Sequence, residues 1–181
     1  PAHNPWHLAA RAAQGHRPVP FVHPVATENT MTTSAPSPSP TASLAALQAF
    51  VQAMPVARTL GLRFVHAGAG RVEVEIPVTE AFSFRSGQLQ ATAVFAVADF
   101  AAVAAAGSVL PPGWTNATVD ATVKLVAPAR GVGLRARGRV VDAGRLLTVC
   151  AADVYAVDGS GQETLCATLL ATARNIEPGP R

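Results

Sequence analysis

The sequence predicts an α+β domain in which one long apolar helix is wrapped by a five- or six-stranded antiparallel sheet, with a short amphipathic helix ahead of both. Residues 91 to 107 read ATAVFAVADFAAVAAAG, an apolar run long enough for a helix that is apolar on every face. On either side of this run, apolar and polar residues alternate as they do in strands. Glycine turns separate these segments, which favours antiparallel pairing.

The composition fits one domain and argues against several classes of function. The chain has 181 residues, is 49% hydrophobic and carries a net charge of +3 that is spread along its length, so no nucleic-acid footprint is expected. No apolar stretch is long enough to span a membrane, and no secretory signal is recognised. We therefore expect a cytoplasmic protein that binds neither nucleic acid nor membrane. Its mildly basic surface is compatible with a phosphorylated small ligand.

The first 41 residues are predicted to be a disordered tail. They show no helical or strand period and end in the Pro/Ser tract SAPSPSPTA. Met31 is typical of a natural start, so residues 1 to 30 are interpreted as an upstream extension or a cloning remnant. Residues 42 to 177 are predicted to form the single domain, and residues 178 to 181 a C-terminal tail.

The possible metal ligands do not form a pattern that indicates a metal site. The histidines of the tail are irregularly spaced, and Cys150 and Cys166 lie in apolar, strand-like segments without a neighbouring Cys or His. We expect two buried, reduced thiols and no metal.

The first elements of the domain follow from the apolar spacing. A helix is expected from Ser43, as its N-cap, to Met54, and PVARTLG is expected to be a turn that stops at Gly61. Two strands should follow, joined by a turn at residues 68 to 70.

The long helix is expected from Gln88 to Ala106, with Gly107 as its C-cap. Its apolar residues cover every face, so it should be buried all round. Three or four strands should follow, in the segments TNATVDATVKLVAPAR, VGLRARGRVVDAG, RLLTVCAADVYAV and QETLCATLLATARNI.

Three stretches of the chain resemble the phenylacetic-acid-degradation (PaaI-like) type of the hotdog-fold acyl-CoA thioesterases. They are the helix VFAVADFAAVAAAGSVLPPG, the strand TVDATVKLVAPARG and the hairpin GRVVDAGRLLTVCAADVYA. The resemblance extends from Met54 to Ile176. It implies the hotdog fold, hydrolysis of an acyl-coenzyme A thioester with no cofactor beyond the coenzyme A of the substrate, and a homodimer or homotetramer.

The resemblance places the chemistry on the long helix. In the family this helix opens with His-Gly-Gly, and a catalytic Asp or Glu follows nine residues after the His. Asp99 matches that acid, whereas the triplet here reads Gln90-Ala91-Thr92. Thioester hydrolysis needs donors for the developing oxyanion. The amide of Ala91, helped by Thr92 or the Gln90 side chain, is the candidate at the helix start.

Asp99 follows Ala91 by about 12 Å along the same helix, too far to act on the same carbonyl. Hotdog dimers resemble one another in running their long helices antiparallel, which implies a site shared between subunits. Asp99 would be its general base or nucleophile, with its basicity raised by apolar surroundings. The alternatives are a structural role for Asp99 near the dimer seam and a role for Gln90 only as a polar residue at the helix start.

Other residues are candidates for binding the substrate. Asn116, Thr118 and Asp120 alternate on the strand after the helix and either line the site or form a solvated face. His66, the only histidine of the domain, sits in a strand and is expected to be structural. Pocket depth should depend on the packing of four phenylalanines: Phe82, Phe84, Phe95 and Phe100.

Four basic residues could meet the phosphates of coenzyme A, although each also fits a solvated strand face. They are Lys124, Arg130, Arg139 and Arg145. Arg130 and Arg145 are the predicted substrate-binding residues, and Arg145, just after the Gly144 turn, is the first to test.

Two other functions stay open at this point. One is a non-catalytic acyl-CoA or acyl-ligand binding hotdog protein that has lost the His-Gly-Gly motif. The other is a scaffold dimer without a ligand.

Overall fold

The structure, a computed structural model, describes residues 40 to 179. The predicted N-terminal tail therefore falls, up to residue 39, outside the described residues, as does the end of the C-terminal tail. No helix in the described range is long and apolar enough to cross a membrane.

Two helices begin the described part of the domain: α1 (Pro40–Ala53) and α2 (Pro55–Leu60). The predicted N-cap at Ser43 is wrong, because α1 already starts at Pro40 and Ser43 lies inside it. Proline is tolerated in the first turn, where an amide has no helical partner. The expected turn at residues 55 to 61 is instead the helix α2, with a proline at its start. Gly61 does stop it, in the left-handed region at a φ of 67°.

Six strands form one antiparallel sheet, which confirms the predicted number and direction. They are β1 (Arg63–Gly68), β2 (Arg71–Pro77), β5 (Thr115–Leu125), β6 (Gly133–Ala143), β7 (Leu147–Val157) and β8 (Glu163–Ile176). Their order across the sheet is β1-β2-β6-β7-β8-β5, so β5 forms one edge. A short 3-10 turn, η1 (Glu80–Phe82), and a small hairpin of β3 (Ser83–Arg85) and β4 (Gln88–Leu89) were not predicted.

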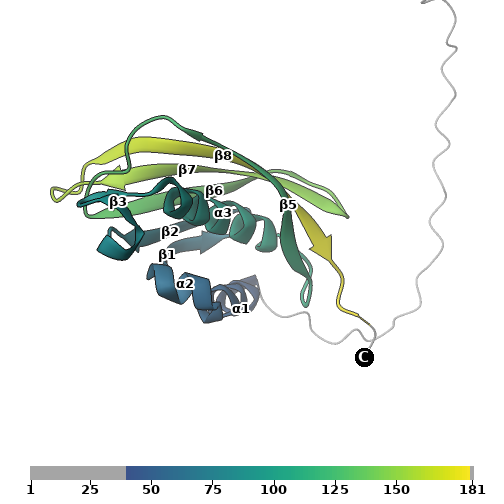
Figure 1. The fold of residues 1–181 in the computed structure, drawn as a ribbon. Coiled ribbons are helices and arrows are strands. Elements are labelled where there is room, and N and C mark those ends of the chain that lie inside the picture. The colour runs from purple at the N-terminus through teal and green to yellow at the C-terminus, as the bar shows by residue number, and fades with distance from the viewer. Residues whose placement is uncertain (1–39, 180–181) are drawn as a thin grey trace, which may run out of the picture. The chain divides into compact units, whose positions relative to one another are not determined.

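The long helix α3 (Ala91–Gly107) lies against the concave face of the sheet, which curves over it in Figure 1. It starts three residues later than predicted, because Gln88 and Leu89 pair as β4, and Ser108 rather than Gly107 is its C-cap. Gly138 of β6 permits the contact. A Cβ at this position would lie 2.0 Å from the carbonyl oxygen of Ala101, so only glycine lets the strand approach the helix this closely.

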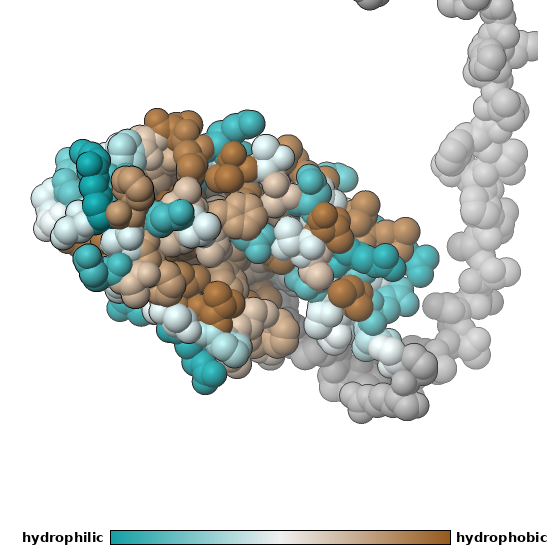
Figure 2. Space-filling view, viewed as in Figure 1, coloured by the Kyte–Doolittle hydropathy of each residue, from teal (hydrophilic) through white to brown (hydrophobic). Residues whose placement is uncertain are grey.

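The prediction that α3 is buried all round is wrong. Nine of its residues are buried, but one stripe is open. The stripe follows the helical spacing and consists of Thr92, Phe95, Ala96, Asp99, Phe100, Val103 and Gly107. Figure 2, in the same view as Figure 1, shows apolar surface at the centre of this face, over α3. An apolar helix stripe that stays open in a single chain is typical of an interaction surface.

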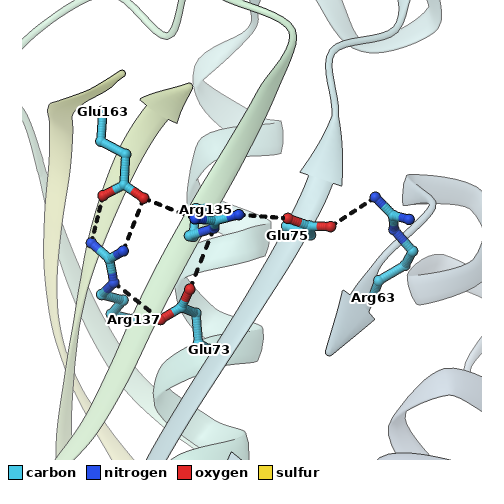
Figure 3. A network of polar contacts seen from close by, with 6 residues as sticks. All are labelled: Arg63, Glu73, Glu75, Arg135, Arg137 and Glu163. Atoms are coloured by element: carbon cyan, nitrogen blue, oxygen red, sulfur yellow. Dashed lines mark hydrogen bonds and ion pairs between the residues drawn. The ribbon is translucent and has the colours of Figure 1, made fainter. Parts of the chain in front are cut away.

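The opposite face of the sheet carries ion pairs. Side chains that alternate with the buried ones on β2, β6 and β8 form a continuous network, shown in Figure 3. Its members are Arg63, Glu73, Glu75, Arg135, Arg137 and Glu163. Arg137 also stacks 4.8 Å from the ring centre of Tyr155. The paired charges tie four strands, β1, β2, β6 and β8, together on the side away from α3.

Candidate active site

The start of α3 is capped by Gln90. Its Oε1 accepts hydrogen bonds from the Thr92 backbone amide at 2.5 Å and from the Thr92 hydroxyl at 2.7 Å. Gln90 itself has an extended backbone, as N-cap residues do. Because capping uses the oxygen of the amide group, the Gln90 Nε2 group remains available as a donor.

The amide of Ala91 is the one first-turn donor without a partner in the described residues. The Ala93 and Val94 amides both bond to the Gln90 carbonyl, at 3.0 and 3.3 Å, and the Thr92 amide is capped. Ala91 is exposed at the helix start. An unpaired amide at the positive end of a helix dipole suits an oxyanion, as predicted for Ala91.

Asp99 lies in the middle of α3, on the open stripe, and is held by β5. The Thr118 hydroxyl donates to its Oδ1 at 2.9 Å. Burial raises the pKa of the Asp99 carboxyl above its ordinary value, and the hydrogen bond from Thr118 offsets part of that rise. The second carboxylate oxygen accepts no hydrogen bond from the described residues. A partly desolvated carboxylate with a free oxygen can take up a proton.

The nearest reactive side chain to Asp99 does not compete with it. Cys150 of β7 is fully buried, and burial, followed by the charge of Asp99, raises the pKa of its thiol to about 11. Its Sγ donates to the Ala171 carbonyl oxygen at 3.6 Å. Cys150 and Cys166 are thus the buried free thiols that were predicted, and neither is a thiolate nucleophile near neutral pH.

A pair of arginines stands beside the start of α3. Gln88 Oε1 accepts from Arg85 Nε and from Arg130 Nε, both at 3.0 Å. A backbone bridge between Gln88 and Arg130 brings the second arginine there from 42 residues away. Neither arginine forms an ion pair within the described residues. Two uncompensated guanidinium groups at one point favour an anionic ligand.

A bulge in β5 separates the three polar residues that were predicted to alternate. Asn116 and Thr118 face α3, where Asn116 Nδ2 donates to the Val103 carbonyl at 2.9 Å. The register then shifts, and Asp120 pairs with Thr172 rather than following on the same face. Asp120 therefore does not line the site, because an extra residue reverses the alternation of a strand.

The other candidate residues lie apart from the α3 start. Arg145, in the turn between β6 and β7, pairs with Glu177 at 3.2 Å, at the end of the sheet where α3 finishes. Arg139 pairs with Asp153 on the outer face at 3.5 Å. His66 is in β1, at the sheet edge opposite β5. Within one chain, Arg130 lies beside Gln88, two residues before the N-cap Gln90, whereas Arg145 lies elsewhere.

Solved structures with this arrangement of helix and sheet include thioesterases. A thioesterase family protein from Silicibacter pomeroyi is 34% identical to this chain, and the match covers 75% of this chain and 99% of that one with a TM-score of 0.71. The chain belongs to the hotdog thioesterase family. This membership confirms the fold and the resemblance inferred from the sequence.

Two more distant structures share this fold. A phenylacetic acid degradation-related protein from Ralstonia eutropha is 26% identical, over 73% of this chain and 98% of that one, at a TM-score of 0.62. The E. coli PaaI protein, at 18% identity, matches 76% of this chain and 96% of its own with a TM-score of 0.65, which shows the shared fold. No protein-family model and no curated protein matches the chain. The family assignment points to a hydrolase.

Sequence reasoning missed Arg85, Gln88 and the effect of the Asp99 charge on the Cys150 thiol. Gln88 was placed inside the long helix, so the pairing that gathers Arg85 and Arg130 was not expected. The available signal was the short polar stretch FRSGQL, in which Ser-Gly indicates a turn and hence a hairpin ahead of the helix.

Proposed function

We propose that the protein hydrolyses acyl-coenzyme A thioesters in two equivalent sites, each formed by Asp99 of one subunit and the α3 start of the other. The supporting observation is the position of two complementary groups on one helix, a free amide at its exposed start and a carboxylate on its open stripe. The free Ala91 amide precedes Asp99 by eight residues, which is about 12 Å along the helix axis. One chain therefore supplies an oxyanion donor and a base but holds them too far apart.

A second copy related by two-fold symmetry would complete both sites at once. If the two α3 helices run antiparallel with Ala91 opposite Asp99, the axis passes near Phe95, midway between them. Phe95 is exposed by 37%, on the apolar stripe. The adjacent edge strand β5 adds an unpaired backbone and the exposed side chain of Val119. Helix stripe and strand edge together provide a self-complementary apolar surface.

In this site the chain's residues have separate roles. The Asp99 carboxylate takes a proton from a water molecule, whose oxygen attacks the thioester carbonyl carbon. The partner subunit's Ala91 amide and the partner subunit's Gln90 Nε2 donate hydrogen bonds to the developing oxyanion. When the carbon–sulfur bond breaks, the proton on Asp99 passes to the leaving thiolate. The products are a carboxylic acid and free coenzyme A.

The arginine pair beside the α3 start is proposed to bind the phosphates of coenzyme A. Arg85 and Arg130 lie next to the same helix start that receives the carbonyl, and guanidinium groups suit phosphate recognition. Arg145, paired with Glu177 at the other end of the sheet, is not part of this proposal.

Mixing two inactive variants tests both the chemistry and the sharing of the site. Asp99→Ala removes the base. Ala91→Pro removes the free amide while keeping the helix, because proline suits the first helical position and Gln90, with a ψ of 151°, already has the extended conformation preferred before proline. Loss of one oxyanion donor should lower kcat by roughly 10²- to 10³-fold.

After co-refolding of the two variants in equal amounts, mixed dimers should contain one intact site each. Activity on a panel of acyl-CoA esters should then return to about a quarter of wild type, because half of the dimers are mixed and each has one site of two. Asp120→Ala, an acid on the outer side of β5, is the matched control and should keep full activity. Undiminished turnover by Asp99→Ala contradicts the mechanism, and no recovery in the mixture contradicts the shared site. Saturable binding with no hydrolysis by wild type would favour the non-catalytic alternative.

A further inference from the structure

A cavity of about 390 Å³ lies at the other end of α3, between α1, the α3–β5 loop and the first residues of β5. Its lining is mainly apolar and includes Leu47 and Phe50 of α1 and Leu110 and Trp114 of the loop. Phe50 is exposed by 56% although it is a large aromatic residue. Cavities of this size and composition are typical of small-molecule sites. None of the four phenylalanines expected to shape a pocket lines it.

The cavity and Asp99 lie along the same stripe of α3. Gly107, which forms part of its wall, lies eight residues after Asp99 on the same stripe of α3, with Val103 between them. On the facing strand, Asn116 lines the cavity and Thr118, two residues on, holds Asp99. Asn116 also fixes the helix at this point through the Val103 carbonyl. A ligand extended along the stripe would therefore reach from the Asp99 carboxylate to the cavity.

We propose that this cavity receives the end of a medium-length apolar acyl chain whose thioester carbonyl lies at Asp99. The proposal rests on the proposed function and names its substrate class. Eight helical residues separate Asp99 from the cavity wall by about 12 Å. An extended hydrocarbon chain advances roughly 1.25 Å per carbon for bonds of about 1.5 Å, so about eight to ten carbons span this distance. A two-carbon acyl group would leave the cavity empty.

The proposed site fixes where the carbonyl and the phosphates of the substrate lie. The carbonyl would lie between Asp99 and the partner subunit's Ala91, and the coenzyme A phosphates would lie near the arginines beside that same helix start. The acyl chain would run along the open stripe toward Gly107 of the subunit that supplies Asp99. Between Asp99 and Gly107 the stripe carries Phe100 and Val103, both half-buried, which give this path an apolar wall.

Filling the cavity should change chain-length preference without changing the chemistry. Ala46 is exposed on α1 and lines the cavity, so Ala46→Phe places a ring there with little effect on folding. We expect kcat/KM for decanoyl-CoA to fall by about tenfold or more, while the value for acetyl-CoA changes by less than about twofold. Ala49→Phe is the matched control, because Ala49 is an exposed alanine of the same helix outside the cavity, and it should alter neither value.

A second measurement does not depend on hydrolysis. The chain has two tryptophans, and Trp114 lines the cavity. In the full-length Trp6→Phe variant, Trp114 alone reports by fluorescence. Decanoate and decanoyl-CoA should shift its emission saturably, acetyl-CoA should not, and Ala46→Phe should abolish the shift.

The two readouts separate the inference from the proposed function. Hydrolysis of decanoyl-CoA that is unaffected by Ala46→Phe, with no response from Trp114, would overturn the acyl pocket and leave the thioesterase activity intact. A saturable Trp114 response to decanoate in a protein that hydrolyses no ester would uphold the pocket and refute the proposed function.

Discussion

Replacement of Thr118 by Val should move the acid limb of the pH–activity profile upward. The Thr118 hydroxyl donates to Asp99 Oδ1 at 2.9 Å, and this hydrogen bond lowers a carboxyl pKa that burial has raised. Valine keeps the shape of threonine and removes the hydrogen-bond donor. In the variant, nothing then offsets the rise that burial causes in the pKa of Asp99. Protonated Asp99 cannot accept a proton from water. Activity therefore falls as the pH drops through the pKa of Asp99, and in the variant that fall begins at a higher pH.

The size of the shift follows from the strength of the lost bond. A hydrogen bond to a charged group contributes about 1.5 to 3 kcal/mol, and one pKa unit corresponds to about 1.4 kcal/mol. Asp99 and Thr118 are both partly open to solvent in the single chain, which favours the lower end. We expect a shift of roughly one pH unit. Well above this limb, kcat/KM should be close to that of wild type.

The assay is kcat/KM for acyl-CoA hydrolysis between pH 4 and 9, followed by the released thiol of coenzyme A. Thr122→Val is the control, because it makes the same change on the same strand, at an exposed position that has no contact with Asp99. An unchanged acid limb in Thr118→Val would refute the role of Asp99 as the titrating base. An equal shift in both variants would refute the assignment of the effect to the hydrogen bond.

Three further changes test the fold and the charged groups. Gly138→Ala should lower the free energy of unfolding by about 3 kcal/mol or more in urea melts, because its Cβ meets the main chain of α3, whereas Gly159→Ala, with no atom within 4 Å, should have little effect. Arg130→Ala should raise KM for acyl-CoA by roughly fivefold and leave kcat unchanged, as expected for the loss of an exposed ion pair worth about 1 kcal/mol. Arg145→Ala is its control, and an equal rise in KM there would refute the binding of phosphate by Arg130. The arginines of β6 lower the pKa of Glu163, so its stabilisation is present above its ordinary pKa and is lost as the pH falls through the lowered value. Glu163→Gln should therefore cost about 1 kcal/mol at pH 7, and its unfolding free energy should depend less on pH below 5 than that of wild type.

The sequence predicted the main elements because their signals are local. Alternation and glycine turns identify β2, β6, β7 and β8, and the Ala-rich run identifies α3. The open stripe of α3 was not predictable in the same way. Alanine and valine occur on every face of this helix, so the sequence does not say which face the sheet covers. That choice depends on the edge position of β5 and on the close approach at Gly138, both of which are tertiary features.

The relative positions of the candidate residues could be predicted along one helix, but not where distant segments meet. Ala91 and Asp99 are separated by a fixed rise, so their spacing could be worked out in advance. The meeting of Arg85 with Arg130 depends on a backbone bridge between segments 42 residues apart. The face of β5 on which Asp120 lies depends on a single bulged residue, which no alternation pattern reveals.

The exchange of His-Gly-Gly for Gln90-Ala91-Thr92 leaves the donors of the site in place and removes a titrating group. Gln90 uses its oxygen to cap α3 and keeps its Nε2 group free, and the Ala91 amide stays unpaired without any need for glycine. A glutamine side chain has no proton to exchange near neutral pH, whereas a histidine at this position would titrate. Asp99, whose pKa is raised by burial, is then the side chain of the proposed site that titrates as the base. The acid limb should consequently follow one ionisation, and the same property makes the Thr118→Val shift a direct measurement of Asp99.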